Sequence, residues 1–386
     1  MSGFSRAEVS LPIDNAAALT ERHKKRLVAI VALVLLCIPG ILLNLSMALP
    51  KANNAIDFTQ FYAASRLAGT GHLYNWDELR ALEAQYQGPP IPSGRLPVVA
   101  YAMRAISWLP FSAARVVWLA FCTAAMLVLA LAWPGADRRV MLAALAWSIP
   151  VGILLVLGQD TPAWLLFFTA GVVLLEKDKP GLAGVSFALC LCKYHLAIGV
   201  PVWLVAQRRW KALGAAAAGV AVLMGACFLI EGPGWPRPYL AVIRNPIFSV
   251  ADSRMPNLRG VAYWLPDSPL VELALAAVVV VLLWLACRRH LAAGWAGAMT
   301  AAAGLVLGHH AYANDCALLI PLAVVAMGRP VPGWLKFWGV VLLTPVLTLL
   351  LVSHAPYVGQ WAVVGYVIAM LAYASAANSS RLSRPV

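Results

Sequence analysis

Residues 22–49 read RHKKRLVAIVALVLLCIPGILLNLSMAL, a basic cluster followed by a long apolar run. At about 1.5 Å per helical residue, the run from Leu27 to Leu49 is long enough to cross ~30 Å of hydrocarbon. A secretory signal peptide has a shorter apolar stretch and a cleavage site of small residues. We therefore expect an uncleaved first transmembrane helix whose basic end faces the cytoplasm.

The composition of the whole chain agrees with a membrane protein. Apolar residues make up 62% of the 386 residues and charged residues 12%, against roughly 45–50% and 25% in ordinary soluble domains. These values exclude a water-soluble globular enzyme and a disordered chain. The seven cysteines lie in or beside apolar segments without CxxC spacing, which excludes a disulfide scaffold and favours small apolar core residues.

The apolar segments after the first predict an all-α, polytopic membrane protein with about 10–13 transmembrane or re-entrant helices. We expect one transmembrane catalytic domain over 27–377, between cytoplasmic tails 1–26 and 378–386. The stretches 50–95 and 231–268 are too polar to span and are expected as outer loops, the first with short interfacial helices. The later apolar segments are 96–133, 140–157, 163–175, 181–206, 212–230, 270–287, 292–308, 315–327, 335–352 and 359–377.

The formal net charge of +13 can be sorted by membrane side. If 96–133 contributes one net crossing and 181–206 is a hairpin of two short helices, the basic clusters fall in cytoplasmic loops. The outer loops are then slightly acidic, so the positive excess is a topology signal and no nucleic-acid partner is needed. Full crossing by both halves of 96–133, around Pro110, would place two basic clusters outside, which the charge bias disfavours.

The first outer loop begins with Asp57 and an aromatic stripe at helical spacing, Phe58, Phe61 and Tyr62. Such a stripe suits the headgroup region, where it would face lipid or a prenyl chain. Asp57 has two compatible interpretations, a helix N-cap and a general base at the water–membrane boundary. Asn75, three residues before a glutamate, has the spacing of a capping box and predicts a second short helix.

Lys193 lies in the middle of the apolar segment 181–206 and is followed two residues later by His195. A lysine at that depth costs about 2.5–3.5 kcal/mol on insertion scales and needs compensation. It either snorkels to an interface or is held as a cation for an anionic headgroup or phosphate. Residues 158–161 (GQDT) form a polar turn between two spans, in which Gln159 is either a plain turn residue or a substrate contact.

Residues 309–315 (HHAYAND) lie between apolar segments on the predicted outer side. Adjacent histidines point in different directions on a helix, which makes a poor metal site. Hydrogen bonding of His309 and His310 to a phosphate or sugar is the better functional interpretation. Asp315 is either a substrate contact or the N-cap of the following span.

The second outer loop contains four arginines, and a solvated loop or contact with anionic lipid accounts for three of them. They are Arg237, Arg244, Arg254 and Arg259. Asn257 and Arg259 come just before Tyr263 and Trp264. An arginine fork beside aromatic rings is what a lipid-linked phosphate requires.

Several motifs occur in a fixed order along the chain. They are Asp57-Phe58, Phe61-Tyr62-Ala63-Ala64, Gly71, Leu73-Tyr74, Pro97, Pro110, Ala113-Ala114, Trp118, Gly158-Gln159, Lys193, Asn257-Leu258-Arg259-Gly260, His310 through Asp315, Leu318-Leu319 and Pro321. In this order they resemble glycosyltransferase family 87, whose members use polyprenyl-phosphate sugars and include mycobacterial mannosyltransferases. The resemblance covers roughly residues 45–385.

The resemblance implies a GT-C fold in a bacterial inner membrane, with a cytoplasmic N-terminus and an active site on the periplasmic face. The donor would be a hexose, mannose first, on polyprenyl phosphate, and the acceptor a lipid or glycan. Asp57 would be the general base of an inverting displacement that uses no cofactor, with a role for a divalent metal left open. We expect the donor phosphate to bind Arg259, Lys193, His309 and His310. Further substrate contacts are expected from Tyr62, Gln159, His195, Asn257 and Asp315.

A transporter or flippase of a lipid-linked saccharide is the alternative. It predicts functional charges near the membrane midplane and repeat-related broken helices, whereas the two broken segments here share no internal similarity. A scaffold protein would leave Asp57 as a cap. A glycosyltransferase requires Asp57, Arg259, His309 and His310 to border one cavity.

Overall fold

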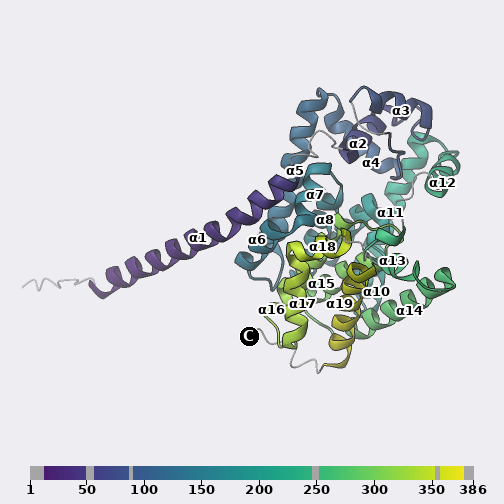
Figure 1. Cartoon of the computed structure of the whole chain (residues 1–386). Coiled ribbons are helices and arrows are strands. Elements are labelled where there is room, and N and C mark those ends of the chain that lie inside the picture. The colour runs from purple at the N-terminus through teal and green to yellow at the C-terminus, as the bar shows by residue number, and fades with distance from the viewer. Residues whose placement is uncertain (1–12, 49–55, 87–89, 246–251, 353–356, 378–386) are drawn as a thin grey trace, which may run out of the picture.

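All regular secondary structure in the described part of the chain is helical, and no strand occurs there (Figure 1). The structure is a computed structural model that describes residues 13–48, 56–86, 90–245, 252–352 and 357–377. Its helices include several that are long and apolar enough to cross a membrane. The predicted all-α, polytopic class is therefore confirmed.

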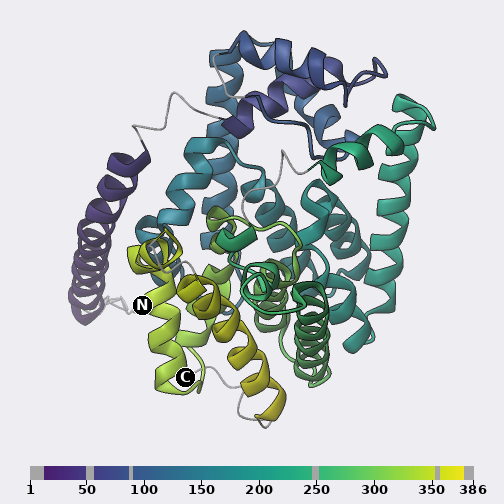
Figure 2. The ribbon, with the colours of Figure 1, turned by 45° about the vertical axis from the view of Figure 1, so that its right-hand side comes forward.

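The first helix, α1 (Ile13–Ala48), begins before the basic cluster and continues through the apolar run. It projects from the rest of the molecule and approaches it near its C-terminal end (Figures 1 and 2). There the side-chain amide of Asn44 donates a hydrogen bond of 2.8 Å to the carbonyl oxygen of Ala146. The predicted tail segments 1–12 and 378–386 lie outside the described residues.

Within the described residues, five helical segments can cross a membrane by length and composition. They are Leu27–Ser46 of α1, α5 (Phe111–Ala132), α11 (Trp210–Glu231), α14 (Ser268–Cys287) and α19 (Tyr357–Ala376). Two bent pairs are each a broken span or a re-entrant loop. They are α6 (Arg138–Trp147) with α7 (Ile149–Leu157), bent by 67°, and α17 (Gly333–Leu343) with α18 (Pro345–Val352), bent by 77°.

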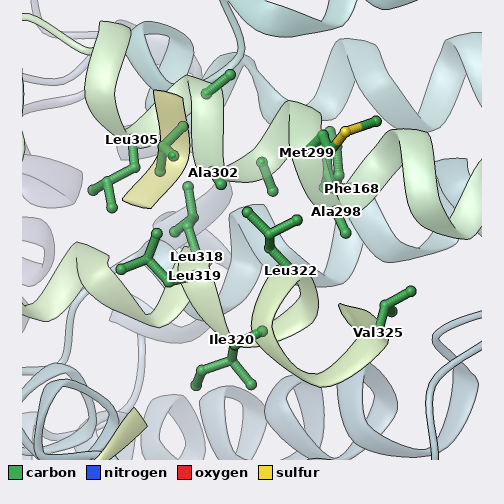
Figure 3. Packing of buried hydrophobic residues seen from close by; sticks show 14 of the residues in the cluster. Phe168, Ala298, Met299, Ala302, Leu305, Leu318, Leu319, Ile320, Leu322 and Val325 are labelled. Atoms are coloured by element: carbon green, nitrogen blue, oxygen red, sulfur yellow. The ribbon is translucent and has the colours of Figure 1, made fainter. Parts of the chain in front are cut away.

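Shorter apolar helices fill the centre of the body. They are α8 (Thr161–Glu176), α15 (Ala293–Leu307) and η5 (Ala313–Leu319) with α16 (Ile320–Met327). Every residue of α15 from Ala293 to Val306 is buried. Figure 3 shows its side chains meeting those of η5 and α16, among them Ala302, Leu305, Leu318 and Leu322. Because most of α15 is alanine or glycine, neighbouring backbones can approach it closely.

Four short helices form a layer at one end of the body (Figure 1). They are α2 (Ile56–Leu67), α3 (Trp76–Ala84), α4 (Pro97–Ser107) and α12 (Pro236–Arg244). With 11 residues, α4 is too short to cross ~30 Å of hydrocarbon. The segment 96–133 therefore supplies one span, α5, as the charge bias favoured.

The side chain of Asn75 caps α3 as predicted, since its oxygen accepts hydrogen bonds from the backbone N–H groups of Asp77 and Glu78. Its amide also donates to the carboxylate of Glu78 at 2.8 Å. The second predicted outer loop forms α12, η4 (Asp252–Arg254) and α13 (Leu258–Ala262). Both polar stretches are thus folded into short helices that carry candidate site residues.

The segment 181–206 is broken as predicted, into α9 (Pro180–Leu189), η2 (Cys190–Leu196) and α10 (Gly199–Ala206). The break lies at Lys193, whose φ of −137° and ψ of 61° are not helical. A Cβ on Gly304 of α15 would stand 2.1 Å from the carbonyl oxygen of Leu196. The backbone of η2 therefore packs directly against the buried helix α15, which fixes the position of the break.

Candidate active site

A polar cavity of about 820 Å³ lies where the end layer meets the broken helices of the body. Its walls come from α2, the loop before α4, the turn before α8, η2, α12, α13 and the segment after α15. Six of the ten predicted site residues line it: Asp57, Gln159, His195, Arg259, His309 and His310. The four residues that a glycosyltransferase required at one cavity are therefore brought together, and their roles stay predictions.

Asp57 lies in the first turn of α2, which begins at Ile56, so the N-cap interpretation is wrong. Gln159 lines the cavity beside this carboxylate, and its side-chain amide acts to lower the pKa of Asp57. Burial raises the pKa of Asp57 to about 6, although the charges of Arg95 and Lys193 act in the opposite direction. A carboxylate whose pKa approaches neutrality suits general-base chemistry near neutral pH.

The aromatic stripe of α2 lies in the protein interior. Phe58, Phe61 and Tyr62 are at most 3% exposed and belong to one cluster, against which Phe111 packs. The hydroxyl of Tyr62 donates a 2.7 Å hydrogen bond to the carbonyl oxygen of Leu109. The prediction that this stripe faces lipid or the prenyl chain is wrong, because α2 packs against α4 and the start of α5. Tyr62 does not line the cavity, and its predicted substrate contact stays a prediction.

Lys193 is 1% exposed and is paired inside the protein. Its ammonium lies 2.6 Å from Oδ1 of Asp315 and 3.6 Å from Oδ1 of Asp160. It also donates hydrogen bonds to Oγ1 of Thr161 at 2.8 Å and to Oε1 of Gln159 at 3.4 Å. Snorkelling is therefore wrong. Two carboxylates hold this cation, and it does not line the cavity, so direct binding of the donor phosphate by Lys193 stays a prediction.

Arg95 and Asp160 form the second half of the same ionic cluster. Nε and Nη2 of Arg95 lie 2.5 and 3.1 Å from the two carboxylate oxygens of Asp160, a bidentate pair. Burial alone would raise the pKa of Asp160, but Arg95 and Lys193 hold it below its ordinary value. We call Arg95, Asp160, Lys193 and Asp315 the buried charge cluster.

Asp315 is completely buried and does not line the cavity. Besides Lys193, it accepts hydrogen bonds from the hydroxyl of Thr161 at 2.7 Å and from the backbone N–H of Tyr312 at 3.0 Å. The carboxylate is used inside the protein, and its predicted substrate contact stays a prediction. The N-cap interpretation is wrong, since Asp315 lies within the first turn of η5.

Arg259 and His309 form a basic edge of the cavity. One terminal nitrogen of Arg259, Nη2, pairs with Oδ2 of Asp252 at 2.8 Å, and the other contacts the ring nitrogens of His309. The ring of His309 also lies 3.3 Å from Oε1 of Glu272. These contacts hold both side chains at the cavity wall, where Arg259 retains N–H donors for an anion.

Asn257 is fully buried and positions this edge. Its Oδ1 accepts a 3.0 Å hydrogen bond from the backbone N–H of Gly260 at the start of α13, and its Nδ2 donates to the carbonyl oxygen of Gly308 at 2.6 Å. Both ends of the side chain are thus used to join the helix of Arg259 to the residue before His309. The predicted substrate contact of Asn257 stays a prediction, since both ends of its side chain bond to the protein.

His195 and His310 line the cavity with unsatisfied nitrogen atoms. Within the described residues, buried Nε2 of His195 and buried Nδ1 of His310 have no hydrogen-bond partner. Burial lowers the pKa of His310 to about 4, and His309 and Arg259 add to the effect. A neutral imidazole with an unpaired nitrogen at a cavity wall is suited to a polar ligand.

Two cations that line the cavity, Arg95 and Arg244, were not among the predicted site residues. Arg95 follows a Pro-Ser-Gly turn, and its partner Asp160 lies 65 residues further along the chain. No local sequence pattern marks such a distant pair. The available indication is that each of two polar turns contains one charged residue, Arg95 or Asp160, without an evident local partner. Arg244 is exposed at the end of α12, and in sequence it is one of four equivalent loop arginines.

A metal site would need several ligating side chains close together. Among the described residues, no group of three or more His, Cys, Asp or Glu side chains is placed to hold a metal ion. Asp57 and the three histidines are the groups at the cavity that a divalent ion would meet.

The fold and the cavity define a polytopic helical membrane protein with a charged site between its end layer and its broken helices. Residues 97–308 match the model of glycosyltransferase family 87. Because the match covers more than half of the chain, the protein belongs to this family, and membership implies transfer of a sugar from a donor to an acceptor. Asp57, His309 and His310 lie outside the matched residues. A search of curated proteins and a search of solved structures each gave no match.

Proposed function

We propose that the protein is an inverting glycosyltransferase that moves a hexose, mannose first, from polyprenyl phosphate to a lipid or glycan acceptor. One observation carries this proposal: Asp57 and the basic edge of Arg259 and His309 border the same cavity. Displacement at an anomeric carbon needs a base for the attacking hydroxyl and a stabilised leaving group. The cavity offers both to one bound donor.

In this reaction, Asp57 takes the proton of the acceptor hydroxyl while the hydroxyl oxygen attacks the anomeric carbon. The bond between that carbon and the phosphate oxygen breaks, and its electron pair stays on the phosphate. Attack from the opposite side inverts the anomeric configuration. The products are the glycosylated acceptor and polyprenyl phosphate, with Asp57 protonated.

The leaving phosphate carries about two negative charges close to lipid, where fixed cations act more strongly than in water. Arg259, His309 and His310 are the proposed contacts of this group, and Arg244 joins them from α12. Gln159 and His195 line the cavity beside Asp57 and are proposed to contact the sugar or the acceptor. Lys193 does not line the cavity and contacts it through Gln159, to which its ammonium donates a hydrogen bond.

An apolar cavity of about 390 Å³ supports a prenyl-linked donor. It is lined by side chains of α4, α5, α8 and α11, and Asp160 of the buried charge cluster also borders it. An apolar chain placed there would pack against apolar side chains, and its phosphate end would lie toward the polar cavity. The lining includes Val99, Met103, Val117, Phe121, Phe167 and Leu223.

We assign the polar cavity to the periplasmic face of a bacterial inner membrane, with a cytoplasmic N-terminus. The basic cluster before Leu27 supports this orientation, since Lys and Arg are retained on the cytoplasmic side. Three helices of the end layer, α2, α3 and α12, come from the polar stretches 50–95 and 231–268, which sorting by charge places outside.

The test is sugar transfer by purified protein in lipid nanodiscs, given polyprenyl-phosphate mannose and candidate lipid or glycan acceptors. Asp57→Asn should abolish transfer, whereas Asp77→Asn should retain it. Asp77 lies on α3 in the same end layer, with its side chain 86% exposed. Full transfer by Asp57→Asn would remove Asp57 from its role. Translocation of a lipid-linked sugar without any transfer would favour the transporter.

A further inference from the structure

The buried charge cluster joins four segments that are distant in sequence. Arg95 precedes α4, Asp160 precedes α8, Lys193 breaks η2 and Asp315 lies in η5. The side chains of Asp160, Lys193 and Asp315 are 2% exposed or less, and that of Arg95 is 18% exposed. Two cations face two carboxylates, so the cluster is neutral as a whole. A neutral cluster tolerates burial, whereas loss of one member leaves an uncompensated charge.

Gln159 connects this cluster to Asp57. The ammonium of Lys193 has only N–H donors, so the amide oxygen of Gln159 must face it, at 3.4 Å. The amide nitrogen then points away from Lys193. Gln159 lies beside Asp57, because both line the polar cavity and Gly158 packs directly against Phe58, and its amide lowers the pKa of Asp57. An N–H donor stabilises the ionised form of a carboxylate. Lys193 therefore fixes which end of Gln159 the catalytic carboxylate meets.

We propose that Lys193 and its buried charge cluster are positioning residues that orient Gln159 toward Asp57 and set the pH at which Asp57 releases its proton. The proposal rests on the proposed function, in which Asp57 is the general base. It assigns to Lys193 a role that needs no contact with substrate.

The charged and titratable groups that face Asp57 come from several elements. Arg95, Lys193 and Asp160 act on it from the cluster. Across the cavity stand His195, His309, His310, Tyr312, Arg244 and Arg259. On α3, which packs on α2, the buried carboxyl of Glu83 accepts a 2.9 Å hydrogen bond from the backbone N–H of Ile91. Substitution of one residue in the cluster changes its net charge by one unit, in either direction. Such a substitution leaves Arg259 and His309 at the cavity edge unchanged.

Opposite substitutions in the cluster should therefore move Asp57 in opposite directions. Lys193→Met leaves a net negative charge near Asp57 and disfavours its ionised form. Asp160→Asn leaves a net positive charge and favours the ionised form. The double variant Lys193→Met/Asp315→Asn is neutral again. A role of the cluster in packing alone would lower activity in all three variants without ordering their pH dependence.

The experiment measures how the protonation of Asp57 depends on pH in two ways. The first is labelling by a water-soluble carbodiimide, which reacts with the protonated carboxyl, read out at Asp57 by mass spectrometry. The second is the pH profile of kcat/KM for transfer from polyprenyl-phosphate mannose. Lys336→Met is the matched control, because this lysine donates to the carbonyl oxygen of Met327 at 3.1 Å and does not line the cavity.

We expect the midpoint to rise by about one pH unit in Lys193→Met, to fall by a similar amount in Asp160→Asn and to return in the double variant. Lys336→Met should match the native protein. Because a single variant can fail to fold, Lys193→Arg provides a second measurement. It keeps the positive charge, so the pH midpoint for protonation of Asp57 should stay at its native value. Equal midpoints in all folded variants would overturn the proposal. Transfer by Asp57→Asn, with the labelling midpoints still shifted, would overturn the general-base role alone.

Discussion

Gly158 lies directly against Phe58, so that a Cβ added to Gly158 would stand 2.6 Å from the Cβ of Phe58. Phe58 follows Asp57, and Gly158 precedes Gln159, so this contact brings the proposed base close to the side chain of Gln159. The turn at Gly158 has a φ of 70°, and Nε1 of Trp118 donates a 2.8 Å hydrogen bond to its carbonyl oxygen. Only a residue without a side chain permits this approach at this φ.

Gly158→Ala should therefore displace the start of α2 from the turn. We expect transfer to fall by about 10–100-fold, because a shift near 1 Å at a reacting group has that effect. The free energy of unfolding should fall by about 1–3 kcal/mol from the backbone strain and the clash. Steady-state transfer and thermal unfolding in nanodiscs measure the two effects.

Gly71→Ala is the control for this substitution. Gly71 has a φ of 77° but no atom within 4 Å of an added Cβ, so the variant carries the backbone strain without the clash. We expect a stability loss of about 1 kcal/mol and native transfer. Equal losses of transfer in the two variants would show that the contact with Phe58 does not position Asp57.

Transfer should increase with pH through the titration of Asp57. Burial raises the pKa of this carboxyl to about 6, and the base acts in its ionised form, so kcat/KM should fall about tenfold per pH unit below that value. His310 does not titrate in this part of the pH profile, because burial lowers its pKa to about 4 and the ring stays neutral near pH 6. A kcat/KM that is constant from about pH 5 to 8 would contradict Asp57 as the base.

The sequence predicted the fold class because hydropathy and charge bias are local signals that a membrane enforces. It also predicted the break at Lys193, since a lysine in an apolar run needs a compensating partner. The identity of that partner was not predictable, because Asp315 is 122 residues away and reads equally well as a cap. The sequence therefore predicts that a buried charge needs a partner at Lys193, but the long separation along the chain hides which residue that partner is.

Three predicted substrate contacts lie away from the cavity wall for one common reason. The sequence favours Tyr62, Asn257 and Asp315 as contacts because each is polar or aromatic beside a predicted active loop. In the structure, each is buried and uses its polar atoms on the protein itself. Sequence shows that a polar group needs a partner, but whether the partner is protein or ligand depends on packing between α2, α4, α13 and η5.

Asn257→Ala should lower both stability and donor affinity. It removes the cap of α13 and the 2.6 Å hydrogen bond to Gly308, which together are worth about 2–4 kcal/mol in a buried site. Arg259 and His309 would lose their fixed separation, so KM for the donor should rise. Asn75→Ala removes only the exposed cap of α3, and we expect about 1 kcal/mol of destabilisation with an unchanged KM. An unchanged KM in Asn257→Ala would separate Asn257 from the donor site.

Arg244→Ala should weaken donor binding without destabilising the protein. Arg244 lines the cavity at the C-terminal end of α12 and is exposed to solvent, so its charge contributes to attraction of a phosphate and little to folding. We expect KM for the donor to rise about three- to tenfold, with a weaker dependence on ionic strength than in the native protein. Arg237→Ala is the matched control, because Arg237 is an exposed arginine of the same helix that does not line the cavity. Equal changes in KM for the two variants would mean that α12 acts through its general positive charge, and that Arg244 has no specific place in the site.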